Sequence, residues 1–107
     1  MSKHNERQYR LMLAQLKRFE EGQTRLDTLV DGLEGLLNSL EGISHSWKQA
    51  FLHEWGKLED ERAYALFKNL VVFDQETSRR IRLAVSRLKL LVLEKTDDQG
   101  DEGRSSS

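Results

Sequence analysis

Three polar side chains at helical spacing are the first candidates for chemistry in this chain. His45, Gln49 and His53 are four residues apart, so in a helix they point to the same side. Imidazole is a common metal ligand, but a di-iron site in a helical bundle needs Glu-x-x-His pairs on two helices. The sequence has no such pair, because Glu41 precedes His45 by four residues and His53 comes directly before Glu54. We therefore expect no metal site and interpret these histidines as surface or capping residues.

The groups needed for covalent catalysis or phosphate binding are missing as well. The chain has no cysteine, so it has no thiol nucleophile and no disulfide. It contains no Gly-x-Ser-x-Gly motif and no glycine-rich phosphate loop, since Gly32 and Gly35 lie inside a helical pattern. We predict that the protein is not an enzyme and has no catalytic residues and no cofactor.

An acidic helix face is the first candidate for a binding surface. Asp27, Asp31, Glu34 and Glu41 fall within an arc of about 80° if the helix turns ~100° per residue. No basic residue lies in that arc. The face is either merely solvated, or it docks a basic partner, for which complementary charge speeds association and fixes orientation. We assign these four residues to a partner-binding site.

Apolar residues outside the expected inner faces form the second candidate. Leu83 and Leu90 are one heptad apart and lie roughly opposite Ile81 and Leu88. Either the helix is buried on two sides, or an exposed patch meets a partner or a second copy of the chain. Leu83 and Leu90 thus offer a surface for a homodimer. Tyr64 also lies off the inner face, and we add it to the partner-binding site because tyrosine is an effective interface anchor.

The elements that must position these residues are helices. The chain contains no proline, and apolar residues recur at intervals of three and four. This pattern predicts helices over about 3–21, from Thr24 to Gly42, from Ser46 to about 68, and from Asp74 to about 95. Polar residues at the expected helix starts predict N-caps at Thr24, Ser46 and Asp74, and Gly22 and Gly42 are the expected stops. The inner face of the third helix is predicted to contain Trp47, Phe51, Trp55, Leu58, Ala65 and Leu66.

These elements predict an all-α fold, a small antiparallel helical bundle of about four helices. A chain of 107 residues is long enough for one domain. We place that domain at 1–95, and we expect a disordered polar tail over 96–107, where Gly, Asp and Ser predominate.

Composition narrows the class of partner and the compartment. The net charge of −1 argues against a generic binder of nucleic acid or of an anionic membrane, which would carry a basic excess. No apolar run is long enough to span a bilayer, and the N-terminus does not resemble a signal peptide. Together with the lack of cysteine, these features predict a cytoplasmic protein that binds another protein.

The middle of the chain resembles a known class of bacterial protein. The run from Leu26 to Leu40, followed by Trp47, Phe51, the segment Glu54-Trp55-Gly56-Lys57-Leu58-Glu59 and Tyr64-Ala65-Leu66, is similar to small helical immunity proteins. These are encoded beside polymorphic toxins of the Rhs and contact-dependent inhibition type. The resemblance implies a non-catalytic protein that binds and neutralises a cognate toxin. The alternative is a secretion chaperone or helical adaptor for an effector protein, although Gly56 directly follows Trp55 and does not form the Trp-x-Gly turn of helical-hairpin secretion proteins.

Overall fold

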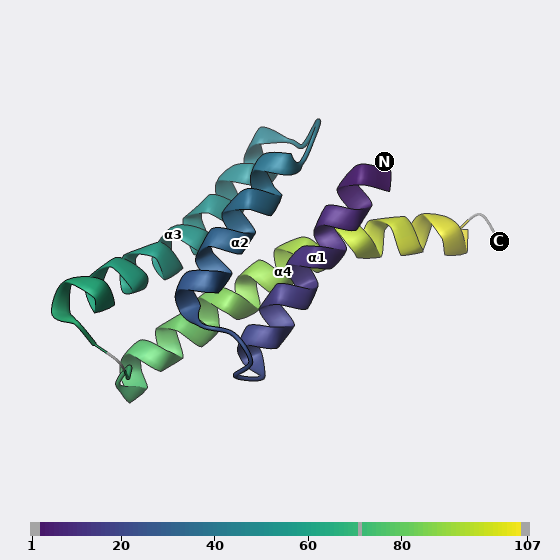
Figure 1. Cartoon of the computed structure of the whole chain (residues 1–107). Coiled ribbons are helices and arrows are strands. Elements are labelled where there is room, and N and C mark those ends of the chain that lie inside the picture. The colour runs from purple at the N-terminus through teal and green to yellow at the C-terminus, as the bar shows by residue number, and fades with distance from the viewer. Residues whose placement is uncertain (1–2, 71, 106–107) are drawn as a thin grey trace.

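The computed structural model describes residues 3–70 and 72–105, with side chains as far as Thr96, and confirms the all-α bundle. It contains α1 (Lys3–Glu20), α2 (Leu26–Ser39), α3 (His45–Lys68) and α4 (Gln75–Ser105). The connections are short, and consecutive helices run in opposite directions (Figure 1). Val71, in the apolar connection between α3 and α4, lies outside the described residues.

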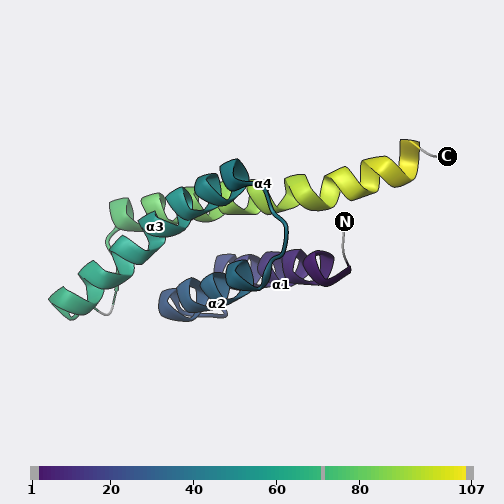
Figure 2. The ribbon, with the colours of Figure 1, turned by 90° about the horizontal axis from the view of Figure 1, so that it is seen from above.

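The four helices form two layers, with α1 beside α2 and α3 beside α4 (Figure 2). Between the layers α1 packs on α4 and α2 packs on α3. The core takes one face from every helix, and its fully buried side chains include Tyr9, Met12, Leu29, Leu33, Phe51, Leu58, Val85 and Leu88. Within each helix these positions lie three, four or seven residues apart and so share one face, and Phe51 and Leu58 are confirmed as part of the predicted inner face of the third helix.

Gly22 ends α1 as the sequence predicts. Its φ of 74° is left-handed, a conformation that glycine adopts without a steric penalty. The N–H of Gly22 donates to the carbonyl of Phe19 at 3.0 Å, and the N–H of Gln23 donates to that of Arg18 at 2.8 Å. These paired bonds form a Schellman motif, which satisfies carbonyls at the end of the helix and turns the chain toward α2.

Both ends of α2 differ from the prediction. Arg25, not Thr24, occupies the N-cap position and makes no side-chain capping bond. The hydroxyl of Thr24 is buried and has no hydrogen-bond partner within the described ranges. At the other end the helix stops at Ser39, and Leu40 has extended backbone. Gly42 has a φ of 63° but lies in the loop, so it shapes the connection to α3 rather than ending α2.

The starts of α3 and α4 are fixed by side-chain caps. Ser44, not the predicted Ser46, caps α3, because its hydroxyl accepts a hydrogen bond from the N–H of Trp47 at 3.2 Å. Asp74 caps α4 as predicted, and its Oδ1 accepts from the N–H of Thr77 at 2.7 Å. That backbone hydrogen bond is the main reason why the pKa of Asp74 is lowered.

Helix α4 is longer than the sequence suggests. The prediction ended it near residue 95, whereas its backbone continues as a helix to Ser105. The segment is polar, but extending an existing helix avoids the cost of nucleation, and no proline interrupts it. The division of the chain at residue 96 stays a prediction. Neither α4 nor any other helix in the described ranges is long and apolar enough to cross a membrane.

The two tryptophans tie α3 to both of its neighbours. The Nε1–H of Trp47 donates to the carbonyl of Leu91 in α4 at 3.0 Å, and its ring meets that of Tyr9 edge-on at 5.7 Å. The Nε1–H of Trp55 donates to the carbonyl of Val30 in α2, also at 3.0 Å. Trp47 is buried and Trp55 is half-buried against the core. Both side chains therefore position α3, as expected of core residues.

Candidate functional site

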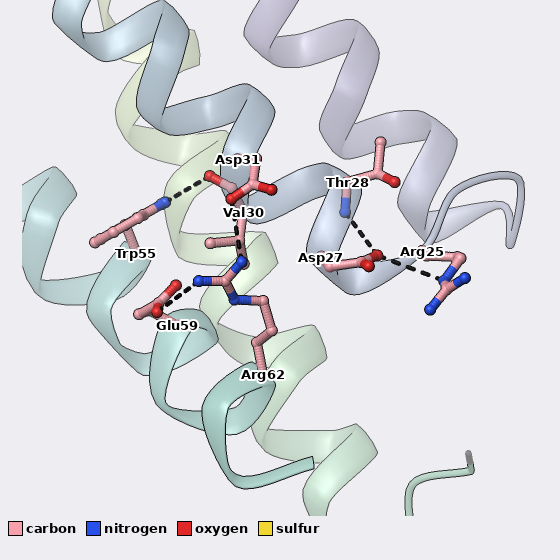
Figure 3. A network of polar contacts seen from close by, with 8 residues as sticks. All are labelled: Arg25, Asp27, Thr28, Val30, Asp31, Trp55, Glu59 and Arg62. Atoms are coloured by element: carbon pink, nitrogen blue, oxygen red, sulfur yellow. Dashed lines mark hydrogen bonds and ion pairs between the residues drawn. The ribbon is translucent and has the colours of Figure 1, made fainter. Parts of the chain in front are cut away.

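The acidic face predicted on α2 is partly neutralised by a residue from another helix. Arg62 of α3 donates to Asp31 at 3.1 Å and to Glu59 at 2.7 Å (Figure 3). The pKa of Arg62 is raised, chiefly by its hydrogen bond to Glu59 and also by the charges of the nearby carboxylates. Asp31 is exposed but already has a basic partner in the free protein. The sequence could not reveal this pair, because the two residues are 31 positions apart.

Asp27 is also engaged within the chain. Its carboxylate accepts a hydrogen bond from the N–H of Thr28 at 2.9 Å and lies 3.5 Å from Nε of Arg25 (Figure 3). These contacts tie Asp27 to the first turn of α2, where a negative charge suits the helix dipole. Asp27 is therefore less available to a partner than its place in the arc suggests.

Of the four acidic residues predicted for the site, Glu34 and Glu41 remain unpaired, since neither forms an ion pair within the part of the chain that the structure describes. Glu34 is exposed on α2. Glu41 is also exposed, but it lies beyond the end of α2, so its predicted place in a helical arc is wrong. Its backbone is instead held by Asn5 of α1, whose side chain bonds both the N–H and the carbonyl of Glu41.

Tyr64 is exposed, as predicted for an interface anchor, and it lies close to a larger apolar surface that the sequence revealed only in part. We name this surface the apolar end, and it consists of Leu66, Phe67, Leu70 and Val72. Leu66 is 72% exposed, Phe67 81% and Val72 79%. The prediction that Leu66 belongs to the inner face of α3 is therefore wrong.

The apolar end is exposed because α3 extends beyond the end of α2, the helix that packs on it from the other layer. α3 has 24 residues and α2 has 14, a difference of about 15 Å at ~1.5 Å per residue. The last buried side chain of α3 is Leu58, and the helix continues for ten residues beyond it. Figure 1 shows this final part of α3 projecting past the end of α2. The predicted bounds, 24–42 and 46–68, make the two helices nearly equal in length, so the sequence did not signal this exposure.

Leu83 and Leu90 lie on the outer side of the layer formed by α3 and α4. They are 51% and 65% exposed, so the side of α4 that carries them is not buried by any of the described residues. A hollow lies beside each leucine in the groove between the two helices. The one beside Leu83 has a volume of about 320 Å³, and the one beside Leu90 about 350 Å³. We name the groove with its two hollows the outer face.

The two histidines and the glutamine at helical spacing in α3 do not form a metal site among the described residues. His45, Gln49 and His53 are all exposed. No group of three His, Cys, Asp or Glu side chains among the described residues has the arrangement of a metal site. The surface of the chain thus offers apolar and charged contact areas. Comparisons of the chain with protein-family models, with curated proteins and with solved structures find no match.

Proposed function

We propose that this chain is a non-catalytic protein-binding module, an immunity protein that binds and neutralises a cognate bacterial toxin. The observation that carries the proposal is the apolar end, where Leu66, Phe67 and Val72 are each more than two thirds exposed. Several large apolar side chains exposed around the end of one helix are typical of a protein interface. Aromatic anchors such as Phe67 and Tyr64 contribute much of the binding energy at such sites.

Charged side chains border the apolar end, as expected of the rim of an interface. Arg62 is four residues before Leu66, so the two lie on the same side of α3. Arg62 forms ion pairs with both Asp31 and Glu59, so these two carboxylates belong to the same rim. Such a rim adds orientation rather than affinity.

The backbone at the end of α3, which carries part of the apolar end, is fixed by hydrogen bonds before any partner binds. Asn69 has a left-handed φ of 54°, and its N–H donates to the carbonyl of Leu66 at 3.2 Å. The N–H of Leu70 donates to the carbonyl of Ala65 at 2.8 Å. This is a second Schellman motif, which fixes how the chain leaves α3. A preordered surface loses less conformational entropy on binding and so binds more tightly.

The choice of a toxin as the partner rests on the resemblance of residues 26–66 to immunity proteins and on the two unpaired carboxylates. Many such toxins are nucleases with basic substrate grooves. Glu34 and Glu41, which make no ion pair within the described ranges, would attract such a groove. Asp31 contributes less, because Arg62 already neutralises part of its charge.

The test is co-expression with the product of the neighbouring gene, which the proposal expects to be the toxin. Wild type is expected to co-purify with the toxin and to restore growth. The double variant Leu66→Ser, Phe67→Ser should keep its melting temperature, since both side chains are exposed, and should lose neutralisation. Leu11→Ser is the matched control, because Leu11 is a large exposed apolar residue on α1. Full neutralisation by the double variant would show that the apolar end is not the binding surface.

Two charge variants test the acidic part of the surface. Glu34→Lys should slow association with a basic toxin, and higher salt should slow the wild type in the same way. Asp31→Lys should also destabilise the free chain, because it places a cation beside Arg62. A stable complex with an effector that leaves toxicity unchanged would instead favour the chaperone.

A further inference from the structure

The outer face carries a repeated pattern that the proposed toxin-binding surface does not use. Leu83 and Leu90 project from α4 two turns apart, and each has a hollow beside it. The hollow at Leu83 is lined by Lys57, Asp60, Glu61, Arg80 and Ala84. The hollow at Leu90 is lined by Ala50, His53, Glu54, Arg87 and Glu94, among others. The face therefore alternates one projecting leucine and one hollow along its length.

A surface with two projections and two hollows can pair with itself. In an antiparallel arrangement a two-fold axis between Leu83 and Leu90 sets each leucine of one copy opposite the other leucine of the second copy. Each leucine can then enter the hollow beside its counterpart, as knobs enter holes in packed helices. The two volumes, about 320 and 350 Å³, leave room for a leucine side chain in both places.

The charges on α4 favour the same arrangement. The pairing that sets Leu83 opposite Leu90 also sets Arg79 opposite Glu94 of the second copy. Neither Arg79 nor Glu94 forms an ion pair within the described ranges, so both are free to pair between copies. A parallel pairing would instead set Arg79 against Arg79 and Glu94 against Glu94. Charge complementarity thus selects the antiparallel register.

The remaining charges of the outer face are already balanced. Arg87 lies between the two leucines, near the proposed axis, and its guanidinium is 3.8 Å from the buried carboxylate of Glu54. Lys57 is 3.2 Å from the same carboxylate, and Arg80 is 2.9 Å from Glu61. The hollow at Leu83 has two basic and two acidic side chains. A second copy of this face, turned around, can set opposite charges against one another. A strongly charged partner of either sign would meet like charges somewhere on the face.

We propose that the outer face is a homodimer interface, in which Leu83 of each copy enters the hollow beside Leu90 of the other and Arg79 pairs with Glu94. The apolar end is a separate surface. A dimer would therefore present two copies of the proposed toxin-binding surface.

The test uses the purified full-length chain without any toxin. Sedimentation equilibrium across micromolar to submillimolar concentrations should give a monomer–dimer equilibrium. The double variant Leu83→Gln, Leu90→Gln should raise the dimer Kd about tenfold or more with an unchanged circular dichroism spectrum. The variant Leu66→Ser, Phe67→Ser is the matched control and should dimerise like the wild type. A wild type that stays monomeric throughout would overturn the proposal, whatever the toxin experiments give.

Charge reversal tests the register. Arg79→Glu and Glu94→Arg should each weaken the dimer, because each sets two like charges against each other. The double reversal Arg79→Glu, Glu94→Arg should restore wild-type affinity. Single reversals that leave affinity unchanged, or a double reversal that is no better than either single one, would refute the antiparallel pairing.

Discussion

The side-chain amide of Asn5 forms two hydrogen bonds with the backbone of Glu41, 36 residues later in the chain. Its Nδ2–H donates to the carbonyl at 2.6 Å, and its Oδ1 accepts from the N–H at 2.9 Å. Asn5 is buried, and through this clamp α1 fixes the loop that leads from α2 into α3. The loop in turn places Glu41, which the sequence assigned to a helix.

Asn5→Ala should therefore destabilise the chain although it removes little volume. Two backbone groups of Glu41 would lose their partner, which costs on the order of 1–3 kcal/mol. Urea unfolding followed by circular dichroism measures this loss. Asn5→Asp is the control, because it keeps the acceptor but replaces the donor with an anionic oxygen that faces a carbonyl. If Asn5→Ala unfolds at the wild-type urea midpoint, the clamp contributes nothing to stability.

Two glycines within α2 should respond differently to alanine. A Cβ at Gly35 meets nothing within 4 Å, so Gly35→Ala should stabilise the chain by roughly 0.5–1 kcal/mol through helix propensity. A Cβ at Gly32 would lie 2.0 Å from Oε1 of Gln15, so Gly32→Ala should gain less or lose stability. Thermal unfolding distinguishes the two. The double variant Gly32→Ala, Gln15→Ala should recover the gain, and equal effects of both single changes would contradict the close contact.

Trp47 should be far more sensitive to truncation than Trp55. Trp47 is 5% exposed and packs against Tyr9 and Phe51, so Trp47→Ala should cost about 3–5 kcal/mol. Trp55 is only half-buried, and its loss should cost clearly less. Chemical unfolding of each variant gives the comparison. Trp47→Phe keeps a ring in the core but removes the hydrogen bond to Leu91, so its stability should lie between those of the wild type and Trp47→Ala. Equal losses of stability for Trp47→Ala and Trp55→Ala would contradict the expected order.

Because Asp74 caps α4, the stability of the folded chain should depend on pH in the acidic range. The pKa of Asp74 is lowered in the folded chain, mainly by its backbone hydrogen bond from Thr77. Its contribution is therefore present above the unfolded pKa, about 3.9, and is lost as the pH falls through the lower folded pKa. Asp74→Asn can still cap but does not titrate. Melting temperatures measured below about pH 4 should shift in favour of the variant, and parallel curves for both proteins would rule out this role of Asp74.

The sequence predicted the periodic parts of this structure well and the non-local contacts poorly. Inner faces such as those of α1 and α2 follow from apolar spacing alone, and Gly22 and Asp74 act as their residue types suggest. The predicted N-caps Thr24 and Ser46 were wrong, because several polar residues near a helix start can serve as the cap and the tertiary structure determines which one does. Ser44 rather than Ser46 is selected where the clamped loop meets α3.

The candidate site shows the same limit. Tyr64 was correctly read as exposed, because an isolated tyrosine off an apolar stripe is a local signal. The partner of Asp31 could not be found, since Arg62 lies on another helix whose rotation no local pattern fixes. Leu66 was misplaced because periodicity shows which side of α3 it lies on, but not that α2 is too short to cover it.

The indole contacts of α3 give the chain two built-in fluorescent reporters. Trp47 and Trp55 are the only tryptophans in the sequence. Trp47 bonds to α4 within its own layer, whereas Trp55 bonds to α2 across the layers. In a chain that keeps only Trp55, a change in emission reports the separation of α3 from α2. A chain that keeps only Trp47 reports the loss of its contacts with both α4 and Tyr9 of α1. The order in which the bundle comes apart can thus be followed in solution without attaching a dye.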